Sequence, residues 1–377
     1  MKLDSQTYNY TSKKSTNLIL VFAGLVLLIM AWVAGFDSKE FYFSYLTSFF
    51  FWLSIILGAM FFIFVHYAFS ATWSVAIIRV MENTLMLMPV FTILFFPIIA
   101  GMELLFKWLP NHSYWLTHSF EADHLIQHKL PFLNKEFFLQ RAVAYFSLWN
   151  LIAFYIYYTS TNHDITGDHN ALKKLKNFTM SPIGVLLFTS ITFAGSFLAF
   201  LAFLTFTLIR LKDQGYLKDI VSEEHFHDLG KYLFAFTVFY CYIAGAQFYF
   251  IWYSNIPEET IWYLHRWVGS WKTISILLIV GKFFIPFFTL IFRGSKRNIR
   301  LLQFMSIWIL FMHYIDINFI VMPTLHHHDF HFGIYDLASM LGFAAIFIGG
   351  FRYIMSRSPL VPLNDPELIH SINHRNH

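Results

Sequence analysis

Residues 45–69 read YLTSFFFWLSIILGAMFFIFVHYAF and contain no Asp, Glu, Lys or Arg. An α-helix rises about 1.5 Å per residue, so a helix over this stretch would exceed the roughly 30 Å hydrocarbon core of a bilayer. The stretch therefore predicts a membrane-spanning helix.

The whole chain has the composition of a membrane protein. Of its 377 residues, 57% are hydrophobic, 21% are aromatic and only 13% are charged, far from the average soluble domain. Runs of about 18 or more mostly apolar residues predict nine spans. They are 18–35, 45–69, 84–106, 137–160, 183–209, 230–254, 271–292, 300–322 and 334–354. The predicted fold is an all-α integral membrane protein with about nine transmembrane helices.

Lys and Arg near the span ends predict the orientation, because cytoplasmic loops carry an excess of them. With nine spans the termini lie on opposite sides, and nine such residues fall on the N-terminal side against sixteen on the other. The N-terminus is therefore predicted to be periplasmic and the C-terminus cytoplasmic. Lys173, Lys174 and Lys176 oppose this assignment.

The spans divide the chain into four predicted parts. These are an N-terminal segment with the first helix (1–44), a first bundle (45–212), a second bundle (213–355) and a cytoplasmic tail (356–377). A signal peptide is the alternative for the first run, but the run is long for one, so we expect a retained helix. The connection 107–136 is polar and aromatic-rich, and we expect it on the cytoplasmic side, packed against a partner.

The single cysteine, Cys241, limits the redox chemistry. An iron–sulfur cluster needs about four cysteine ligands and c-type haem needs C-x-x-C-H, so both are excluded, as is an internal disulfide. A haem b held by two histidines is left open, with His66 and His313 as the histidines inside spans. We expect no haem, because a lone helical histidine is usually only hydrogen-bonded.

A histidine cluster follows the eighth span in IDINFIVMPTLHHHDFHFGIYD, residues 315–336. Imidazoles together with Asp329 are suitable metal ligands. However, three contiguous histidines do not place alternate ligands on one face of a regular element. We expect a solvated loop rather than a metal site.

Charged residues inside spans are functional candidates, because charge is costly in hydrocarbon. Arg79 and Glu82 are three residues apart just ahead of the third span. That spacing places them on one helical face, where they can neutralise each other. We expect a paired charge at the outer interface, with a role in a proton path as the alternative.

A deeper set of polar residues lies in spans seven and eight. Lys282 is roughly 15 Å from one end of its span, and His313 and Asp316 lie at roughly 20 and 24 Å on the antiparallel neighbour. If these helices touch, the three side chains form a polar ladder suited to a proton relay. A structural ion pair between two helices explains them equally well.

The sixth span and its loop hold further polar residues. Gln247 is a mid-span amide next to small residues, which allow close helix approach. The loop SNIPEETIWYLHR reads as a helix start, with Asn255 as cap and Glu258 and Glu259 at the positive end of the dipole. The two carboxylates beside His265 are equally suited to passing protons to the aqueous side.

The chain resembles the F subunit of bacterial alternative complex III, in the NrfD and polysulfide-reductase membrane-anchor superfamily. The likeness covers about 45–368, and IWYSNIPEETIWYLHR is its most specific block. Other matching pieces are RVMENTLMLMPV, GKFFIPFFTLIFR and SRSPLVPLNDPEL. Positions that match the family's recurring polar residues are Arg79, Glu82, Asp228, Gln247, Glu258, Glu259, His265 and Arg266.

The resemblance implies two four-helix bundles with an additional N-terminal helix in the bacterial cytoplasmic membrane. It implies a respiratory quinol:cytochrome c oxidoreductase subunit without a redox centre of its own, contributing scaffold, a proton path and a second quinone pocket. Asp228, Gln247 and Arg266 are the candidates for that pocket. Menaquinone or ubiquinone and lipids are the implied ligands.

The implied partners carry the redox centres that this chain lacks. They are a sister NrfD-like quinol-binding subunit, an iron–sulfur subunit, c-type haem subunits and a haem–copper oxidase, and no nucleic acid is expected. A standalone proton-coupled secondary transporter is the alternative function, because Lys282, His313 and Asp316 suit ion coupling as well.

Overall fold

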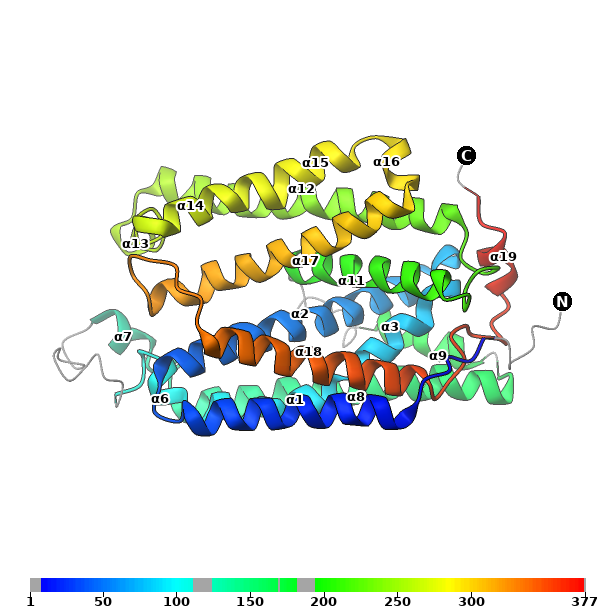
Figure 1. Ribbon diagram of the computed structural model, residues 1–377, viewed down its shortest axis with the longest axis horizontal. Helices are drawn as coiled ribbons and strands as arrows, with labels where there is room; N and C mark the ends of the chain where they lie inside the picture. The colour runs from blue at the N-terminus through cyan, green and yellow to red at the C-terminus, as the bar shows by residue number, and fades with distance from the viewer. Residues whose placement is uncertain (1–7, 111–123, 169, 182–193, 376–377) are drawn as a thin grey trace.

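The computed structural model describes residues 8–110, 124–168, 170–181 and 194–375. Of these residues, 79% are helical, and they form no β-strand. Within these ranges, nine helices are long and apolar enough to cross a membrane (Figure 1). The predicted all-α integral membrane fold is confirmed.

The nine spans match the nine predicted runs. They are Lys14–Ala34 (α1), Lys39–Phe69 (α2), Thr72–Ala100, Lys135–Thr166 (α8), Gly195–Asp213 in α11 (Ala194–Asp213), Glu223–Ser254 (α12), Gly269–Leu290, Ile299–Thr324 and Ile334–Met355 (α18). Shorter helices at the ends of the spans are α6 (Met102–Leu105), α7 (His124–Lys129), α9 (Asn170–Thr179), α13 (Pro257–Leu264), α16 (Arg293–Arg297) and α19 (Leu368–Ile372).

Three spans are composite. The third consists of η1 (Thr72–Ile77), α3 (Ile78–Leu85), α4 (Met88–Leu94) and α5 (Phe96–Ala100). The seventh consists of α14 (Gly269–Leu278), the π-helical η3 (Ile279–Phe284) and α15 (Ile285–Leu290), and the eighth of α17 (Ile299–Val321) and η4 (Met322–Thr324). The second residues of α4, α5 and α15 are prolines, Pro89, Pro97 and Pro286. The spans are interrupted there because proline has no N–H to donate to the preceding turn.

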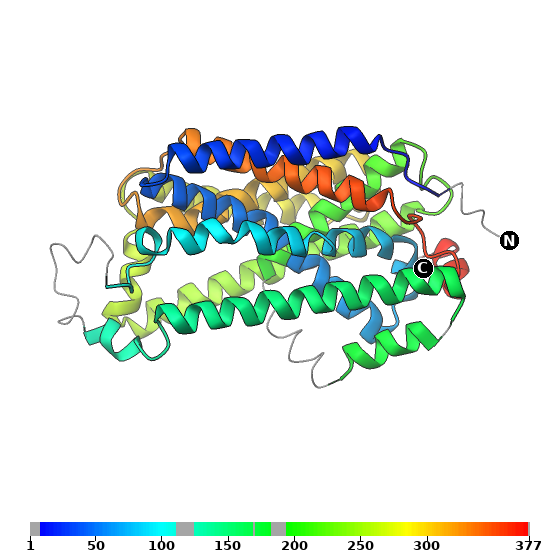
Figure 2. The ribbon, with the colours of Figure 1, turned by 90° about the horizontal axis from the view of Figure 1, so that it is seen from below.

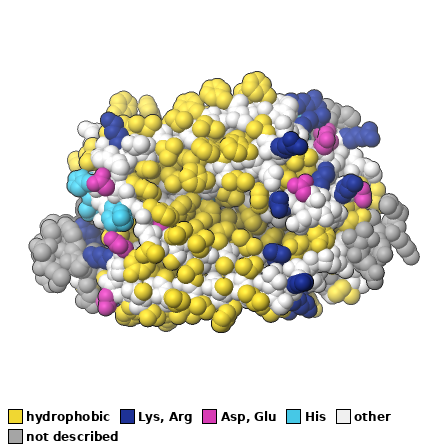
Figure 3. Space-filling view, viewed as in Figure 1, with side chains coloured by type: hydrophobic (Ala, Val, Ile, Leu, Met, Phe, Trp, Pro, Cys, Tyr) yellow, Lys and Arg dark blue, Asp and Glu magenta, His cyan; other side chains and the backbone are white. Residues whose placement is uncertain are grey.

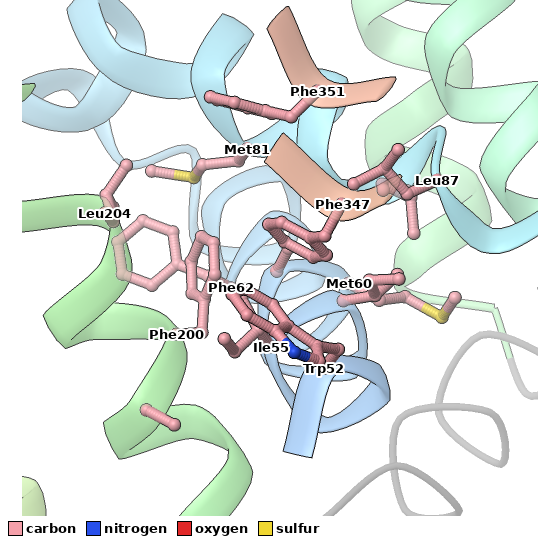
Figure 4. Close-up of a cluster of buried hydrophobic side chains, with 14 of the residues drawn as sticks. Trp52, Ile55, Met60, Phe62, Met81, Leu87, Phe200, Leu204, Phe347 and Phe351 are labelled. Carbon is pink, nitrogen blue, oxygen red and sulfur yellow. The ribbon is translucent and has the colours of Figure 1, made fainter. Parts of the chain in front are cut away.

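The core is organised around α2. Trp52 packs on Phe347 of α18, with 4.6 Å between ring centroids, and Phe62 packs near Phe200 of α11. Figure 4 shows these rings gathered from three helices. Within a bilayer, such packing contacts rather than water exclusion hold helices together.

Helices from both predicted bundles share this core. Helix α2 of the first part packs directly on α17 and α18 of the second, and α11 packs on α17. The predicted boundary at 212/213 coincides with the end of α11. The division into two four-helix bundles stays a prediction.

Helix α1 packs along α18, the last span. A Cβ at Gly24 would lie 2.6 Å from the carbonyl oxygen of Gly342, and one at Gly342 would lie 2.6 Å from Leu28 Cδ2. Glycine at both positions lets the two backbones approach closely. The first apolar run is therefore a packed helix of the bundle in this structure.

The two ends of the chain lie at the same end of the bundle (Figure 1). The backbone N–H of Leu360 donates to the carbonyl of Tyr8 at 3.0 Å, and Arg352 bonds the hydroxyl of Tyr10. We call this the terminus end, and the opposite one, where α6 and α13 lie, the loop end. The prediction that the N-terminus and the C-terminus lie on opposite sides is wrong.

The two termini share one end because the chain between α8 and α12 does not cross the bundle as predicted. Asn364 of the tail bonds the Asp164 carbonyl near the end of α8, and His374 bonds Asp228 near the start of α12. The intervening chain thus returns to the end that it left, and α8 and α11 both run toward the terminus end (Figures 1 and 2). One crossing over 183–209 was expected; its residues 183–193 lie outside the described ranges.

This topology also corrects the placement of the connection 107–136. The connection starts and finishes at the loop end, whereas the described part of the tail, 356–375, covers the terminus end (Figure 1). The prediction that both are cytoplasmic is therefore wrong for a bundle that crosses the membrane, because the two segments lie at opposite ends of it. Of the connection, residues 111–123 lie outside the described ranges.

Basic residues gather at the terminus end (Figure 3). Outside the buried positions 79 and 282, sixteen of the described Lys and Arg residues lie there and seven lie at the loop end. The sixteen are Lys13, Lys14, Lys173, Lys174, Lys176, Arg210, Lys212, Lys218, Lys231, Arg293, Lys296, Arg297, Arg300, Arg352, Arg357 and Arg375. The seven are Lys39, Lys107, Lys129, Lys135, Arg141, Arg266 and Lys272. The three lysines that opposed the predicted orientation lie at the same end as most of the basic residues. They are Lys173, Lys174 and Lys176.

Candidate functional site

An ion pair is buried inside the helix bundle between η3 and α17. Lys282 Nζ donates to Asp316 Oδ2 at 2.5 Å, and the two residues are 1% and 7% exposed. The hydroxyl of Tyr240 on α12 donates to Asp316 Oδ1 at 2.7 Å. The same Tyr240 ring lies 3.9 Å from the ammonium group, a cation–π distance. Three helices thus meet at one charged pair.

The π-helical turn positions Lys282. Because Pro286 has no N–H, the carbonyl of Lys282 lacks its normal α-helical donor, and the wide turn lies directly before this proline. The carbonyl of Gly281 accepts a hydrogen bond from the Trp308 indole at 2.7 Å. A Cβ at Gly281 would lie 2.7 Å from Met312 Cε, so glycine allows α17 to approach. Single π-helical turns recur at functional sites.

His313 completes the group. Its Nε2 lies 2.8 Å from Ser54 Oγ of α2, while its buried Nδ1 has no hydrogen-bond partner among the described residues. The ring interacts electrostatically with Lys282 and Asp316 and faces Gly195 at the start of α11. The structure therefore brings Lys282, His313 and Asp316 together, and sequence reasoning missed Tyr240 and Ser54.

His313 and His66 do not face each other. His66 Nδ1 bonds Ser74 Oγ at 2.7 Å near the end of α2. Ser54, the partner of His313, precedes His66 by twelve residues on α2, which is roughly 18 Å. This separation is too long for two ligands of one haem iron.

A second buried charge group lies near the terminus end. Arg79 Nη1 donates to Glu82 Oε2 at 2.5 Å, and its Nη2 donates to Asp164 Oδ2. Ser160 and Tyr67 complete the group, with the tyrosine hydroxyl 2.9 Å from Glu82 Oε1. The expected Arg79–Glu82 pair is present, but its placement ahead of the span was wrong.

The physical reason is the length of the third span. It begins at Thr72, so Arg79 and Glu82 lie within it, and both are completely buried. Asp164, which balances the arginine together with Glu82, was missed. The sequence could have indicated this residue, because its carboxylate lies only four residues beyond the predicted end of the fourth span.

The acidic loop lies at the loop end. Helix α13 starts at Pro257, so Glu258 and Glu259 occupy its first turn, and both side chains are exposed. Asn255 does not cap this helix; it ends α12 with φ of 48°, a left-handed conformation that asparagine tolerates. The exposed His265 ring lies 5.9 Å from the His327 ring.

Arg266 is a structural residue here. Its Nε and Nη2 donate to the carbonyls of Phe319 and Ile320 at 2.9 Å each, near the end of α17. The guanidinium lies 3.6 Å from the Trp262 ring centroid. Burial lowers the pKa of Arg266 to about 10, so it stays charged at neutral pH. The last carbonyls of a helix favour such a cation.

The three candidates for the quinone pocket do not converge. Asp228 lies at the terminus end, bonded to Lys231 and His374; Gln247 is exposed on α12; and Arg266 lies at the loop end. A shallow groove does run along α12. It is lined by Val238, Cys241, Tyr242, Gly245, Ala246, Tyr249, Phe250 and Phe283. Phe283 connects the groove to the neighbourhood of Lys282.

The histidine cluster lies at the loop end (Figure 3). The carbonyl of His326 accepts from the Trp271 indole, and the carbonyl of His328 accepts from Ser270 N–H. Among the described residues, no three His, Cys, Asp or Glu side chains are arranged to hold a metal ion. The backbone of this loop thus joins the start of α14.

Comparison with known proteins finds no family model and no curated protein that matches the sequence. The resemblance to the complex III subunit is therefore carried by the quoted sequence blocks alone. The geometry around Lys282 and Asp316 is independent of that resemblance.

Proposed function

We propose that this chain is a cofactor-free membrane subunit of a respiratory quinol:cytochrome c oxidoreductase of the alternative complex III type. The support is the residue resemblance over about 45–368, above all the block from Ile251 to Arg266. Within the complex the chain provides scaffold and a proton path. Gln247 lies close in sequence to the groove on α12, which is a candidate place for the hydrocarbon tail of a quinone.

The proton path is supported by the buried pair of Lys282 and Asp316. A carboxylate that bonds both an ammonium group and the Tyr240 hydroxyl can accept a proton from either and pass it on. Opening of the ion pair leaves two buried charges, so a proton moving from lysine to aspartate neutralises both. His313 is a further acceptor beside the pair.

The proposed partners supply the redox centres. The chain has one cysteine, so electrons must pass through iron–sulfur and c-type haem subunits beside it, with a sister NrfD-like subunit as the main quinol site. A haem–copper oxidase is a further proposed neighbour, and menaquinone or ubiquinone and lipids are the proposed ligands. No nucleic-acid partner is proposed.

We place both termini in the cytoplasm of a bacterial cell. Among the described residues, sixteen basic residues lie at the terminus end and seven at the loop end, and an excess of Lys and Arg marks the cytoplasmic side. Under this orientation Glu258, Glu259 and His265 face the periplasm. Their exposure there suits proton release from the path.

The first test is a reduced-minus-oxidised visible spectrum of the tagged chain purified in mild detergent. Bands of c-type haem must come from a partner and would support the respiratory assignment. In the intact assembly, Lys282→Met and Asp316→Asn should then lower proton release per electron, whereas Lys218→Met, at an exposed position, should not. Unchanged proton release in all three would rule out the path.

A proton-coupled secondary transporter is the second candidate. It is favoured by the same buried pair and by the broken third and seventh spans, since transporters bind ions at interrupted helices. A colourless, pure single chain would favour this function. Uptake in proteoliposomes would then have to depend on Lys282 and Asp316.

A further inference from the structure

Helix α12 presents the most exposed face of the bundle. Only 6% of the residues in its most apolar stretch are buried, the lowest share among the nine spans of the described ranges. The shallow groove along this face has a volume of about 550 Å³, which is within the range of sites for small ligands. Val238 and Tyr242 line the half of the groove that is nearer to the terminus end. The shape and the apolar lining suit a hydrocarbon chain.

A row of phenylalanine rings joins this groove to a charged group at the terminus end. Phe283, which lines the groove, packs on Phe287 with 5.3 Å between the ring centroids, and Phe287 packs on Phe234 at 5.4 Å. The ammonium nitrogen of Lys296 lies 5.3 Å from the centroid of the Phe234 ring. All three rings are partly exposed. The apolar surface therefore continues without a break from the groove to Lys296.

Lys231 lies on the same face of α12 as the groove. It precedes two lining residues, Val238 and Gly245, by seven and fourteen positions, and seven residues are close to two helical turns. The Lys231 side chain is 47% exposed and donates to Asp228 at 2.9 Å. Burial and repulsion by Lys231 lower the pKa of Lys296. The two ammonium groups are therefore neighbours beside the end of the groove.

Further basic residues surround the two lysines. Arg297, next to Lys296, pairs with Glu224 at 2.6 Å, and the exposed Arg293 begins the same short helix, α16. The four cations outnumber the two carboxylates bonded to them, which are those of Glu224 and Asp228. Helix α16 directly follows the seventh span, and basic side chains border the apolar surface at this end (Figure 3). The cluster thus lies where lipid headgroups meet the hydrocarbon.

We propose that the groove and the basic cluster, Lys231, Arg293, Lys296 and Arg297, form a binding site for one anionic phospholipid. The phosphate lies against the cluster, and an acyl chain follows α12 past Val238 into the nearer half of the groove. The rise from Lys231 to Val238 is about 10 Å, within the roughly 15 Å of hydrocarbon in one leaflet. Lysine stems cover apolar surface while their charges meet anionic headgroups.

This inference goes beyond the proposed function and does not rest on it, because it requires only that the bundle crosses a membrane. Lipid retention tests it. The purified full-length chain, stripped of lipid in detergent, is titrated with phosphatidylglycerol or with phosphatidylcholine, and bound lipid is counted by native mass spectrometry. We expect one phosphatidylglycerol to bind at least about tenfold more tightly than phosphatidylcholine, because the zwitterionic headgroup brings no net charge to the cluster. Equal affinity for the two lipids would overturn the proposal.

Charge variants test the position of the headgroup. Lys231→Gln should weaken phosphatidylglycerol binding about fivefold, the equivalent of about 1 kcal/mol for one basic residue at an anionic surface. Lys231→Arg keeps the charge and should bind like the wild type. Lys218→Gln removes a charge from an exposed position at the same end and should leave binding unchanged. Equal losses in Lys231→Gln and Lys218→Gln would reveal a diffuse charge effect and refute the site.

Groove variants test the position of the acyl chain. Val238→Trp should obstruct the groove and weaken phosphatidylglycerol binding, whereas Val143→Trp, at a position on α8 that is 67% exposed, should not. If Val238→Trp binds the lipid as tightly as the wild type, no chain occupies the groove. If inorganic phosphate competes as well as the lipid does, the cluster recognises phosphate alone. Either result would contradict the proposal.

Discussion

Replacing Lys282 by methionine removes one member of the buried pair and leaves the other in place. Asp316 would keep the hydrogen bond from Tyr240, but its charge would lose the ammonium group 2.5 Å away. Breaking a buried pair in this way costs about 3–5 kcal/mol, because an uncompensated charge remains. We therefore expect Lys282→Met to lower the free energy of unfolding by about that amount.

The double variant Lys282→Met/Asp316→Leu separates the charge from the packing. Replacing both members with apolar residues of similar volume is commonly neutral or even stabilising by about 1–4 kcal/mol. Its stability should therefore exceed that of Lys282→Met. The comparison is a double-mutant cycle, so it also needs the single variant Asp316→Leu. Lys218→Met, at an exposed position, serves as the control.

The measurement is denaturant unfolding of the purified chain in detergent. The four variants are compared on condition that the dependence of the unfolding free energy on denaturant concentration is the same for all of them. If Lys282→Met stays within about 0.5 kcal/mol of the wild type, as ordinary surface substitutions do, the pair makes no contribution and the reasoning fails. Equal destabilisation of the single and double variants would also refute it, since packing rather than charge would then explain the loss.

Three further predictions follow from the structure. Arg79→Met should destabilise by about 3–5 kcal/mol in the same assay, because two buried carboxylates lose their shared cation; wild-type stability would contradict this. Gly24→Val should cost about 1–3 kcal/mol by overpacking α1 against α18, whereas Gly245→Val, whose Cβ would meet nothing within 4 Å, should unfold like the wild type. Reporter fusions at the N- and C-termini should give the same side, and a tag in 107–136 the opposite side; termini on opposite sides would refute the topology.

A buried pair does not by itself imply greater stability. If the double apolar variant is as stable as the wild type, packing alone can hold η3 against α17, and the charges are kept for another reason. The adjoining Tyr240 and His313 both carry exchangeable protons. Loss of proton release without loss of stability in that variant would then assign the pair to transport rather than to scaffolding.

The apolar runs by themselves determined the membrane class, the nine helices long and apolar enough to cross a membrane, and the positions of Lys282 and Asp316 inside two of them. This succeeded because crossing a bilayer demands a length and a composition that are local in the sequence. The contact between Lys282 and Asp316 was predictable as well, since consecutive antiparallel helices are neighbours. The site roles of these residues stay predictions.

Only the tertiary structure decided the rest. The pairing of Arg79 with Asp164 and the separation of Asp228 from Arg266 both involve residues far apart in the chain. The predicted topology was wrong for a related reason. The sequence predicted one crossing too many between α8 and α12, and this error reverses the predicted direction of every later span. Hydrophobicity reports whether a residue lies in the membrane, but which residues meet there depends on how the helices pack.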